Sequence, residues 1–384
     1  NNLKLSAENI TNTAGRIEGQ NVNLNATNDL QSIQGLIKAN GTLNLQAGND
    51  LTMVGGALQN TGKGATTLSA GNDIMLMAHE RGSHVLQDPN APFDPNNYTK
   101  SGTYDQTGAT IDVGGSLSLT AGKDIFAQGT QVNAGGAINL KAEGDISITT
   151  ALKGSEFESK SQYTSSSMWG LGKKITTTTV TNTHLRNTLS SWNGASFSAN
   201  AGRDLTLQGT QIKAGGIDLR AGNNVNVLAV FDVDEMSHTK SVVNKGLAKL
   251  LGKDSSDNYY DITRKALLPS LNAGGGALTI NAGNNINLQA PQVSAGQINL
   301  AANQINIDIV KDFRQLEETH TRKNLLWQST DSVGSINEVA HLSQFNVPAG
   351  AFNFKAPGGI TVQLPEGSDL RQQIERMASQ PGQE

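Results

Sequence analysis

The sequence predicts an all-β fold: a right-handed parallel β-helix (β-solenoid) of about ten coils, with long β-hairpin excursions and a short C-terminal helix. Three observations support this prediction. A phrase rich in glycine and asparagine recurs every 20 to 23 residues within unbroken runs. Short runs of alternating apolar and polar residues, which are typical of strands, follow each phrase. Aromatic residues make up only 4% of the chain, whereas glycine occurs 42 times.

The recurring phrase reads Ala, Gly, a polar residue, then Asp or Asn before an alternating run, as in 47–51, 121–125 and 282–286. A second phrase, such as 131–136, precedes another alternating run. Glycine and asparagine favour the backbone conformations of turns. We expect the recurring acidic or amide residue to form a ladder of side-chain hydrogen bonds along one turn of the solenoid. The members of this ladder are Asp29, Asp50, Asp73, Asp124, Asp145, Asp204, Asn224 and Asn285.

Four interruptions divide the repeats. The first, 79–108, carries Pro89, Pro92 and Pro95 and is expected to be an ordered or semi-ordered loop without strands. The other three resemble one another and are interpreted as hairpin excursions. The complete division is coils at 1–78, 109–150, 195–229 and 274–308, the loop insertion at 79–108, hairpins at 151–194, 230–273 and 309–345, a terminal coil at 346–367, and a short helix and linker at 368–384.

Each of the three hairpins has an apolar tip between polar limbs, and a helical turn is expected at 245–251. Two arrangements are compatible with this pattern: the hairpins project from the rod and bind a partner, or the tips fold back over the flank of the solenoid. We expect a binding role, because loops on a rigid scaffold are free to vary. The candidate partner or membrane contacts are Met168, Trp169, Leu171, Leu247, Leu250, Leu251, Leu325, Leu326 and Trp327.

Composition argues against several classes of protein. The absence of cysteine excludes thiolate chemistry, and a net charge of −4 without basic runs argues against nucleic-acid binding. The histidines lack the spacing of a metal site. We therefore expect no catalytic residues, no metal, no cofactor and no small-molecule substrate. A β-helical polysaccharide lyase or hydrolase is the rival class, but a ladder position that accepts Asp and Asn equally is more consistent with a structural role.

The repeat phrases resemble those of filamentous-haemagglutinin-type exoproteins, which Gram-negative bacteria secrete by the two-partner route. The run Glu158-Ser159-Lys160-Ser161, the Trp-Gly-Leu-Gly tip at 169–172 and the Thr-rich segment 175–181 are similar to inserts of the second, distal repeat region. Large contact-dependent growth inhibition proteins of the CdiA type share that region. The segment 362–370 is similar to the sequence that precedes their toxin modules. The amino-terminal secretion domain, pretoxin motif and toxin module of the family are not found in this sequence.

This resemblance implies a non-enzymatic section of a larger secreted protein at the cell surface of a Gram-negative bacterium. Its implied partners are the outer membrane of a target cell or a surface receptor, and an outer-membrane transporter that recognises the missing amino-terminal domain. In the growth-inhibition family the region supports delivery of a toxin. In the adhesin branch the same repeats form a stalk that contacts host cells or promotes aggregation. The sequence leaves these two alternatives open.

Overall fold

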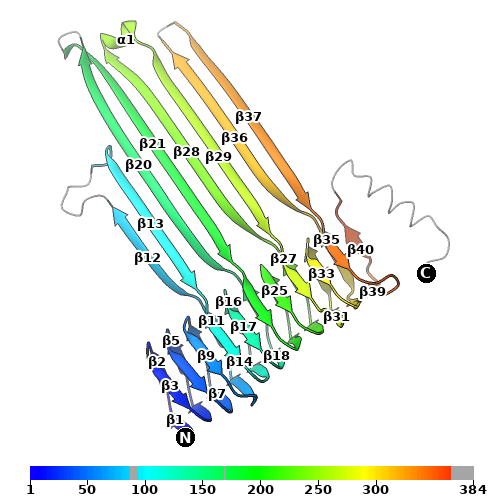
Figure 1. The fold of residues 1–384 in the computed structure, drawn as a ribbon. Helices are drawn as coiled ribbons and strands as arrows, with labels where there is room; N and C mark the ends of the chain where they lie inside the picture. Colours follow the sequence, from blue (N-terminus) through cyan, green and yellow to red (C-terminus); the bar gives the residue numbers. More distant parts are fainter. Residues whose placement is uncertain (87–93, 168–169, 325, 365–384) are drawn as a thin grey trace, which may run out of the picture.

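The chain folds into a parallel β-solenoid from which a second sheet projects (Figure 1). The computed structural model describes residues 1–86, 94–167, 170–324 and 326–364. Each coil contributes one strand to each of three parallel sheets, named A, B and C in the order in which the chain passes through them. Sheets A and B have 11 strands each and sheet C has 10, so the solenoid has about the number of coils that the repeats predict.

Sheet A consists of β1 (Leu3–Ala7), β4 (Val22–Ala26), β7 (Leu43–Ala47), β10 (Thr66–Ala70), β15 (Leu117–Ala121), β18 (Ala137–Ala142), β23 (Ser196–Ala201), β26 (Ile217–Ala221), β31 (Ala277–Ala282), β34 (Gln297–Ala301) and β39 (Phe352–Lys355). Sheet B consists of β2 (Ile10–Thr13), β5 (Leu30–Ile33), β8 (Leu51–Val54), β11 (Ile74–Met77), β16 (Ile125–Gln128), β19 (Ile146–Thr149), β24 (Leu205–Gln208), β27 (Val225–Leu228), β32 (Asn285–Gln289), β35 (Gln304–Asp308) and β40 (Ile360–Val362). Sheet C consists of β3 (Arg16–Gly19), β6 (Leu36–Ala39), β9 (Ala57–Asn60), β14 (Thr110–Val113), β17 (Gln131–Ala134), β22 (Ser190–Asn193), β25 (Thr210–Lys213), β30 (Ser270–Asn272), β33 (Gln292–Ser294) and β38 (Gln344–Asn346).

The core is a narrow column of aliphatic side chains enclosed by the three sheets. Successive side chains of a strand point to opposite faces, so every second residue enters the column. In β4, for example, Val22, Leu24 and Ala26 are buried and stack in register on the equivalent residues of β7. The largest buried side chains are Trp192 and Phe197, whose rings meet edge to face at 5.9 Å between centroids.

A ladder of hydrogen bonds runs along the turn between sheets A and B. The backbone N–H of the Asp or Asn in each coil donates to a side-chain oxygen of its equivalent one coil earlier, for example Asp50 to Asp29 at 3.2 Å and Asn224 to Asp204 at 2.9 Å. The same contact links all eight residues given for this ladder above, and the series starts one coil earlier, at Asn9. The side chain needs to supply only an acceptor oxygen, which explains why both Asp and Asn occupy the position.

The interruptions of the repeat build one continuous antiparallel sheet, named sheet D here. Its eight strands form four hairpins, and each hairpin pairs with the next along the chain (Figure 1). The hairpins are β12 (His79–Leu86) with β13 (Tyr98–Thr107), β20 (Ala151–Ser167) with β21 (Gly172–Thr188), β28 (Val230–Gly246) with β29 (Asp254–Leu267), and β36 (Val310–Lys323) with β37 (Gln328–His341). The hairpins project from the rod and do not cover its flank.

The spacing of the hairpins along the rod explains why they merge into a sheet. The hairpins leave the solenoid after the fourth, sixth, eighth and tenth strands of sheet B, which is one hairpin for every two coils. Neighbouring strands in any sheet lie about 4.8 Å apart, so two coils advance the rod by about 9.6 Å. A hairpin has two strands and therefore has the same width. Successive hairpins meet at the normal strand spacing without a gap or an overlap.

The structure corrects three expectations from the sequence. Residues 79–108 are not a loop without strands, because they form β12 and β13; β12 is exposed along nearly its whole length, and neither strand has the apolar–polar sequence alternation that marks a half-buried strand. Residues 190–194, 270–272 and 344–345 belong to the solenoid and not to the hairpins expected at 151–194, 230–273 and 309–345, and Trp192 is a core residue. The three expected hairpins are not separate excursions, since they share sheet D with the first.

Two further expectations concern the ends of the excursions. The helical turn expected at 245–251 is confirmed by a short helix, α1 (Ala248–Leu251), at the tip of the third hairpin. The short helix expected at 368–384 lies outside the described residues.

The ladder predicts different results for two substitutions of Asp204. The Asp204 Oδ1 accepts hydrogen bonds from the Asn224 N–H and from the Asn223 Nδ2, at 2.9 and 2.8 Å. Asp204→Ala removes the acceptor from a partly buried N–H and should lower the free energy of unfolding by about 1–2 kcal/mol. Asp204→Asn keeps the oxygen and should change it by less than ~0.5 kcal/mol. Urea denaturation followed by circular dichroism measures both, and an equal loss in the two variants would contradict this account of the ladder.

The matching of coils to hairpins predicts the result of removing one coil. Between the second and third hairpins, residues paired on successive coils are 20 positions apart in all three sheets, as in Ser190 with Thr210. Deletion of residues 195–214 therefore restacks the solenoid in register but brings the two hairpins about 4.8 Å closer than their width allows. We expect strands β21 and β28 to lose mutual pairing, seen as faster amide hydrogen exchange in both.

A matched control for this deletion is available near the amino terminus. Residues 22–42 also form one coil, since Val22 pairs with Leu43, and they precede all four hairpins. Their deletion should leave exchange in sheet D unchanged. Normal protection of β21 and β28 after the first deletion would show that sheet D does not depend on the coil spacing.

Candidate functional site: the distal end of sheet D

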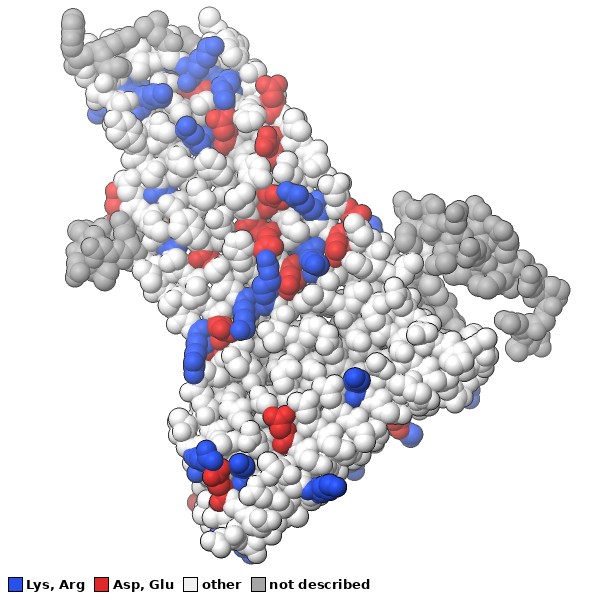
Figure 2. Space-filling view, in the orientation of Figure 1, with Lys and Arg blue, Asp and Glu red and all other residues white. Residues whose placement is uncertain are grey.

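Ion pairs lie at each of the three seams where one hairpin meets the next. At the first seam, Lys153 of β20 pairs with Asp105 of β13 at 3.1 Å. At the second, the carboxylate of Asp234 on β28 contacts two side chains of β21, His184 at 2.7 Å and Arg186 at 2.6 Å. Figure 2 shows charged side chains gathered on sheet D, while the solenoid face in view is mostly uncharged.

The third seam repeats the arrangement of the second. Asp257 of β29 accepts contacts from His320 at 2.9 Å and from Arg322 at 2.6 Å, both on β36. We call each of these two groups, Asp234 with His184 and Arg186 and Asp257 with His320 and Arg322, a clamp. In each clamp the histidine and arginine are two residues apart on one strand, so both side chains lie on the same face of the sheet. Nearer the solenoid, Arg314 of β36 pairs with Asp261 of β29 at 3.0 Å. These clamps fix neighbouring hairpins relative to each other.

The clamps shift the pKa of their carboxyl groups. Hydrogen bonds from His320 and then Arg322 lower the pKa of Asp257 below its usual value. For Asp234, burial raises the pKa, but the contacts of His184 and Arg186 outweigh burial and the net pKa is lowered. The charged form of each carboxylate is therefore favoured in the folded sheet.

The tips of the second, third and fourth hairpins meet at the distal end of sheet D, defined here as residues 170–174, 245–254 and 322–327 without 325 (Figure 1). The Leu247 N–H donates to the Leu171 carbonyl at 3.0 Å, which joins the second tip to the third. Lys253 lies over the ring of Trp327 at 5.2 Å from its centroid, which joins the third tip to the fourth. The three tips thus form one surface.

This distal end is both basic and apolar. Leu326 is 90% exposed and Leu250 is 62% exposed. The same segments hold seven Lys or Arg residues and one Asp, and Figure 2 shows Lys and Arg near this end of the molecule. The basic residues are Lys173, Lys174, Lys245, Lys249, Lys253, Arg322 and Lys323. Lys173 and Lys245 are direct cross-strand partners, an arrangement of like charges that costs stability unless an anion is near.

Asp254, the single acidic residue of the distal end, stabilises the turn of the third hairpin through hydrogen bonds. The Asp254 Oδ1 accepts the Asn244 N–H at 2.7 Å, and the Asn244 Nδ2 donates to the Lys253 carbonyl at 2.9 Å. Asn244 is buried. In the fourth tip, the Asn324 Oδ1 accepts the N–H groups of Leu326 and Trp327 at 2.9 and 2.8 Å. These local bonds order the turns that present the exposed side chains.

The structure places the candidate contact residues as follows. Leu171, Leu247, Leu250, Leu326 and Trp327 are exposed and share the distal end. Leu251 lies in α1, and its side chain is not described. Met168, Trp169 and Leu325 lie outside the described residues. The basic residues of this surface were missed, although paired lysines at 173–174 and a lysine every four residues at 245, 249 and 253 were a visible signal.

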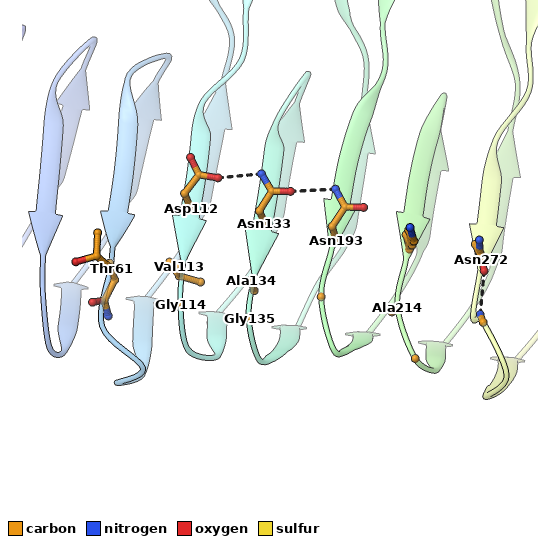
Figure 3. A pocket seen from close by; sticks show the side chains of 15 residues that line it. Thr61, Asp112, Val113, Gly114, Asn133, Ala134, Gly135, Asn193, Ala214 and Asn272 are labelled. Carbon is orange, nitrogen blue, oxygen red and sulfur yellow. Dashed lines mark hydrogen bonds between the residues drawn. The ribbon is translucent and has the colours of Figure 1, made fainter.

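A shallow groove along the solenoid is the second candidate site. It has a volume of about 770 Å³ and follows the corner after sheet C across several coils. Figure 3 shows the side chains of Asp112, Asn133 and Asn193 side by side there, linked by hydrogen bonds of 2.9 and 3.1 Å. Asp112 is the one carboxylate among the lining residues. Glycoside hydrolysis uses a pair of carboxyl groups, so this groove does not provide that chemistry.

The described part of the chain offers neither a cluster of metal ligands nor a membrane-spanning helix. Across residues 1–364, apart from the gaps given above, no three His, Asp or Glu side chains are grouped so as to hold a metal ion. Over the same residues, no helix has the length and apolar character needed to cross a membrane.

A solenoid with a hairpin at every second coil defines the chain as a β-solenoid repeat protein. Residues 95–245 and 251–333 match the hemagglutinin repeat family, and the chain belongs to this family. It is a CdiA-like filamentous haemagglutinin repeat region. The matched residues include most of sheet D, so the hairpins are part of the family pattern.

Relatives with the CdiA name cover much of the chain. A "tRNA nuclease CdiA-2" of Burkholderia pseudomallei is 26% identical over 77% of this chain and 10% of its own length. A "Deoxyribonuclease CdiA" of Dickeya dadantii is 32% identical over 74% of this chain and 9% of its own length. A "tRNA nuclease CdiA" of Escherichia coli O6:K15:H31 is 33% identical over 40% of this chain and 5% of its own length. The chain thus spans a tenth or less of these relatives. No solved structure matches it.

The seam clamps predict a pH dependence of the contact between β29 and β36. A carboxylate whose pKa is lowered on folding contributes stability above its unfolded pKa of about 3.9, and this contribution is lost as the pH falls through the folded pKa. Asp257→Asn should therefore increase amide hydrogen exchange in β29 and β36 at pH 6. The difference from the unsubstituted chain should shrink below about pH 4. A difference that stays constant down to pH 2.5 would argue against an ionic contribution of Asp257.

Proposed function

We propose that this repeat region is a non-enzymatic section of a large secreted exoprotein of a Gram-negative bacterium, and that it engages the outer membrane of a target cell through the distal end of sheet D. In this proposal the contact supports delivery of a toxin carried elsewhere in the protein. Export would use an outer-membrane transporter of the two-partner type. The CdiA relatives support the delivery context, since their names describe nucleases and a toxin.

The observation that carries the proposal is the chemistry of the distal end. Exposed Leu250 and Leu326 lie among seven basic residues, of which Arg322 is paired with Asp257, and the nearby Asp254 accepts hydrogen bonds from Asn244. An anionic lipid surface attracts Lys and Arg by about 1 kcal/mol per residue near the surface. Partial insertion of leucine and tryptophan side chains into the interface adds apolar burial. Basic and apolar groups on one surface therefore favour the outer membrane as the partner.

The rest of sheet D acts in this proposal as a spacer that holds the distal end away from the solenoid. The longest strands, β20, β21 and β28, have 17 residues each and extend the distal end on the order of 55 Å from the solenoid. The clamps between hairpins keep the three tips together, so that their apolar and basic groups can contact one surface at the same time. Several weak contacts made together bind more tightly than any one alone.

Vesicle binding tests the membrane contact. The triple substitution Leu250→Ser, Leu326→Ser and Trp327→Ser should reduce co-sedimentation with vesicles that contain anionic lipid by at least about tenfold, because it removes the apolar groups that insert. Lys173→Glu with Lys245→Glu should weaken binding to anionic vesicles and make it less sensitive to salt. Leu5→Ser is the matched control, since Leu5 is an exposed leucine on β1 of the solenoid.

The outcomes separate the parts of the proposal. If the unsubstituted chain binds no vesicle of any composition, including vesicles with lipopolysaccharide, the membrane contact is wrong. If the chain binds but the triple substitution has no more effect than Leu5→Ser, the distal end is not the contact. For delivery, the triple substitution in the full-length exoprotein should abolish growth inhibition of neighbouring cells while the protein remains on the producer surface.

A further inference from the structure

The outer edge of sheet D, strand β37, has no partner strand on one side in the described residues. It is the last strand of the sheet order, and over Gln328–His341 it contains no Lys, Arg or Pro, the residues that commonly protect an edge. Its apolar side chains Val333, Ile336 and Val339 are 60–70% exposed. A long open edge with exposed apolar residues is a template for pairing with another strand.

The sequence of β37 is complementary to itself in the antiparallel direction. When two copies are centred on Ile336, Ile336 lies opposite Ile336, and Val333 lies opposite Val339. Asp331 then lies opposite His341, whose side chain also contacts Asp312 of β36 at 3.1 Å. Directly opposed residues in an antiparallel pair lie on the same face, so each of these pairs is in side-chain contact.

This register is favoured over the two adjacent registers. Every second residue of an edge strand points its N–H and C=O outward, so the partner strand can slide only in steps of two residues. A step in one direction places Val339 opposite Asp331, and a step in the other places it opposite Ser335. Both steps replace a contact between valines with an apolar–polar contact. Of these three registers, only the one centred on Ile336 matches Val333, Ile336 and Val339 with one another.

We propose that two copies of this chain associate through their β37 strands, antiparallel and centred on Ile336, and so join their projecting sheets into one. The contact has twofold symmetry about an axis perpendicular to the sheet, as expected for a contact made by the same surface on both copies. All seven contacts between neighbouring strands within sheet D are antiparallel, and the new contact continues this pattern. The overlap from Asp331 to His341 is short, so the dimer is expected to be reversible and dependent on concentration.

Cysteine cross-linking tests the register directly, because the chain contains no cysteine. Ile336→Cys should form a disulfide-linked dimer on mild oxidation, since the two sulfur atoms face each other across the axis. Val333→Cys alone should cross-link much less, because its opposite residue is Val339. A mixture of Val333→Cys and Val339→Cys chains should cross-link efficiently. Equal cross-linking of all single variants would overturn the register.

Sedimentation velocity tests the association itself. The unsubstituted chain should dimerise as its concentration rises, and Ile336→Lys should weaken dimerisation on the order of tenfold or more because it sets two like charges opposite each other. Val85→Lys is the matched control, since Val85 is an exposed residue of β12 at the other edge of sheet D. Circular dichroism should show that both variants fold. A chain that remains monomeric at all soluble concentrations, or a Val85→Lys variant that loses the dimer, would overturn the proposal.

Discussion

The strand spacing of about 4.8 Å is the constraint on which the architecture depends. It sets the rise of each solenoid coil and the width of each strand in the projecting sheet. Because a hairpin leaves at every second coil, the two periods are equal and the four hairpins form one sheet. A hairpin at every coil would crowd its neighbours, and one at every third coil would leave an unpaired edge on each side. The coil spacing of the solenoid thus determines which hairpins lie next to each other and pair.

The two parts of the molecule are stabilised by different interactions. The solenoid buries a continuous column of aliphatic residues, and its turns are joined by backbone-to-side-chain hydrogen bonds from coil to coil. Sheet D has few buried side chains and no second layer over its described strands. It relies on its backbone ladder, on cross-strand threonines such as those at 176–179, and on ion pairs at its seams. Exposed ion pairs contribute little individually, so their role in selecting the correct neighbour is the larger one.

The contrast between these parts explains what the sequence could predict. The coils were predictable because one face of each strand is buried and the pattern repeats. The helical turn near Lys245 was also visible. The strands of the first hairpin were not, since β12 is exposed along nearly its whole length and neither strand alternates apolar with polar residues. The clamps were hidden because Arg186 and Asp234 are 48 residues apart, and their contact follows from the coil spacing and not from any local pattern. Trp192 was misplaced because it directly follows a hairpin limb.

The coil spacing also governs how the distal end could act. A single tip with one or two exposed leucines binds an interface weakly. Three tips held side by side present their apolar and basic groups together, and the gain from acting together depends on a fixed separation. Leu247 and Leu171 are joined by a backbone hydrogen bond, and Trp327 and Lys253 by a cation–π contact, only because the hairpin roots are correctly spaced far below them. Any change that shifts one root by a coil should therefore divide the distal surface without altering a residue in it.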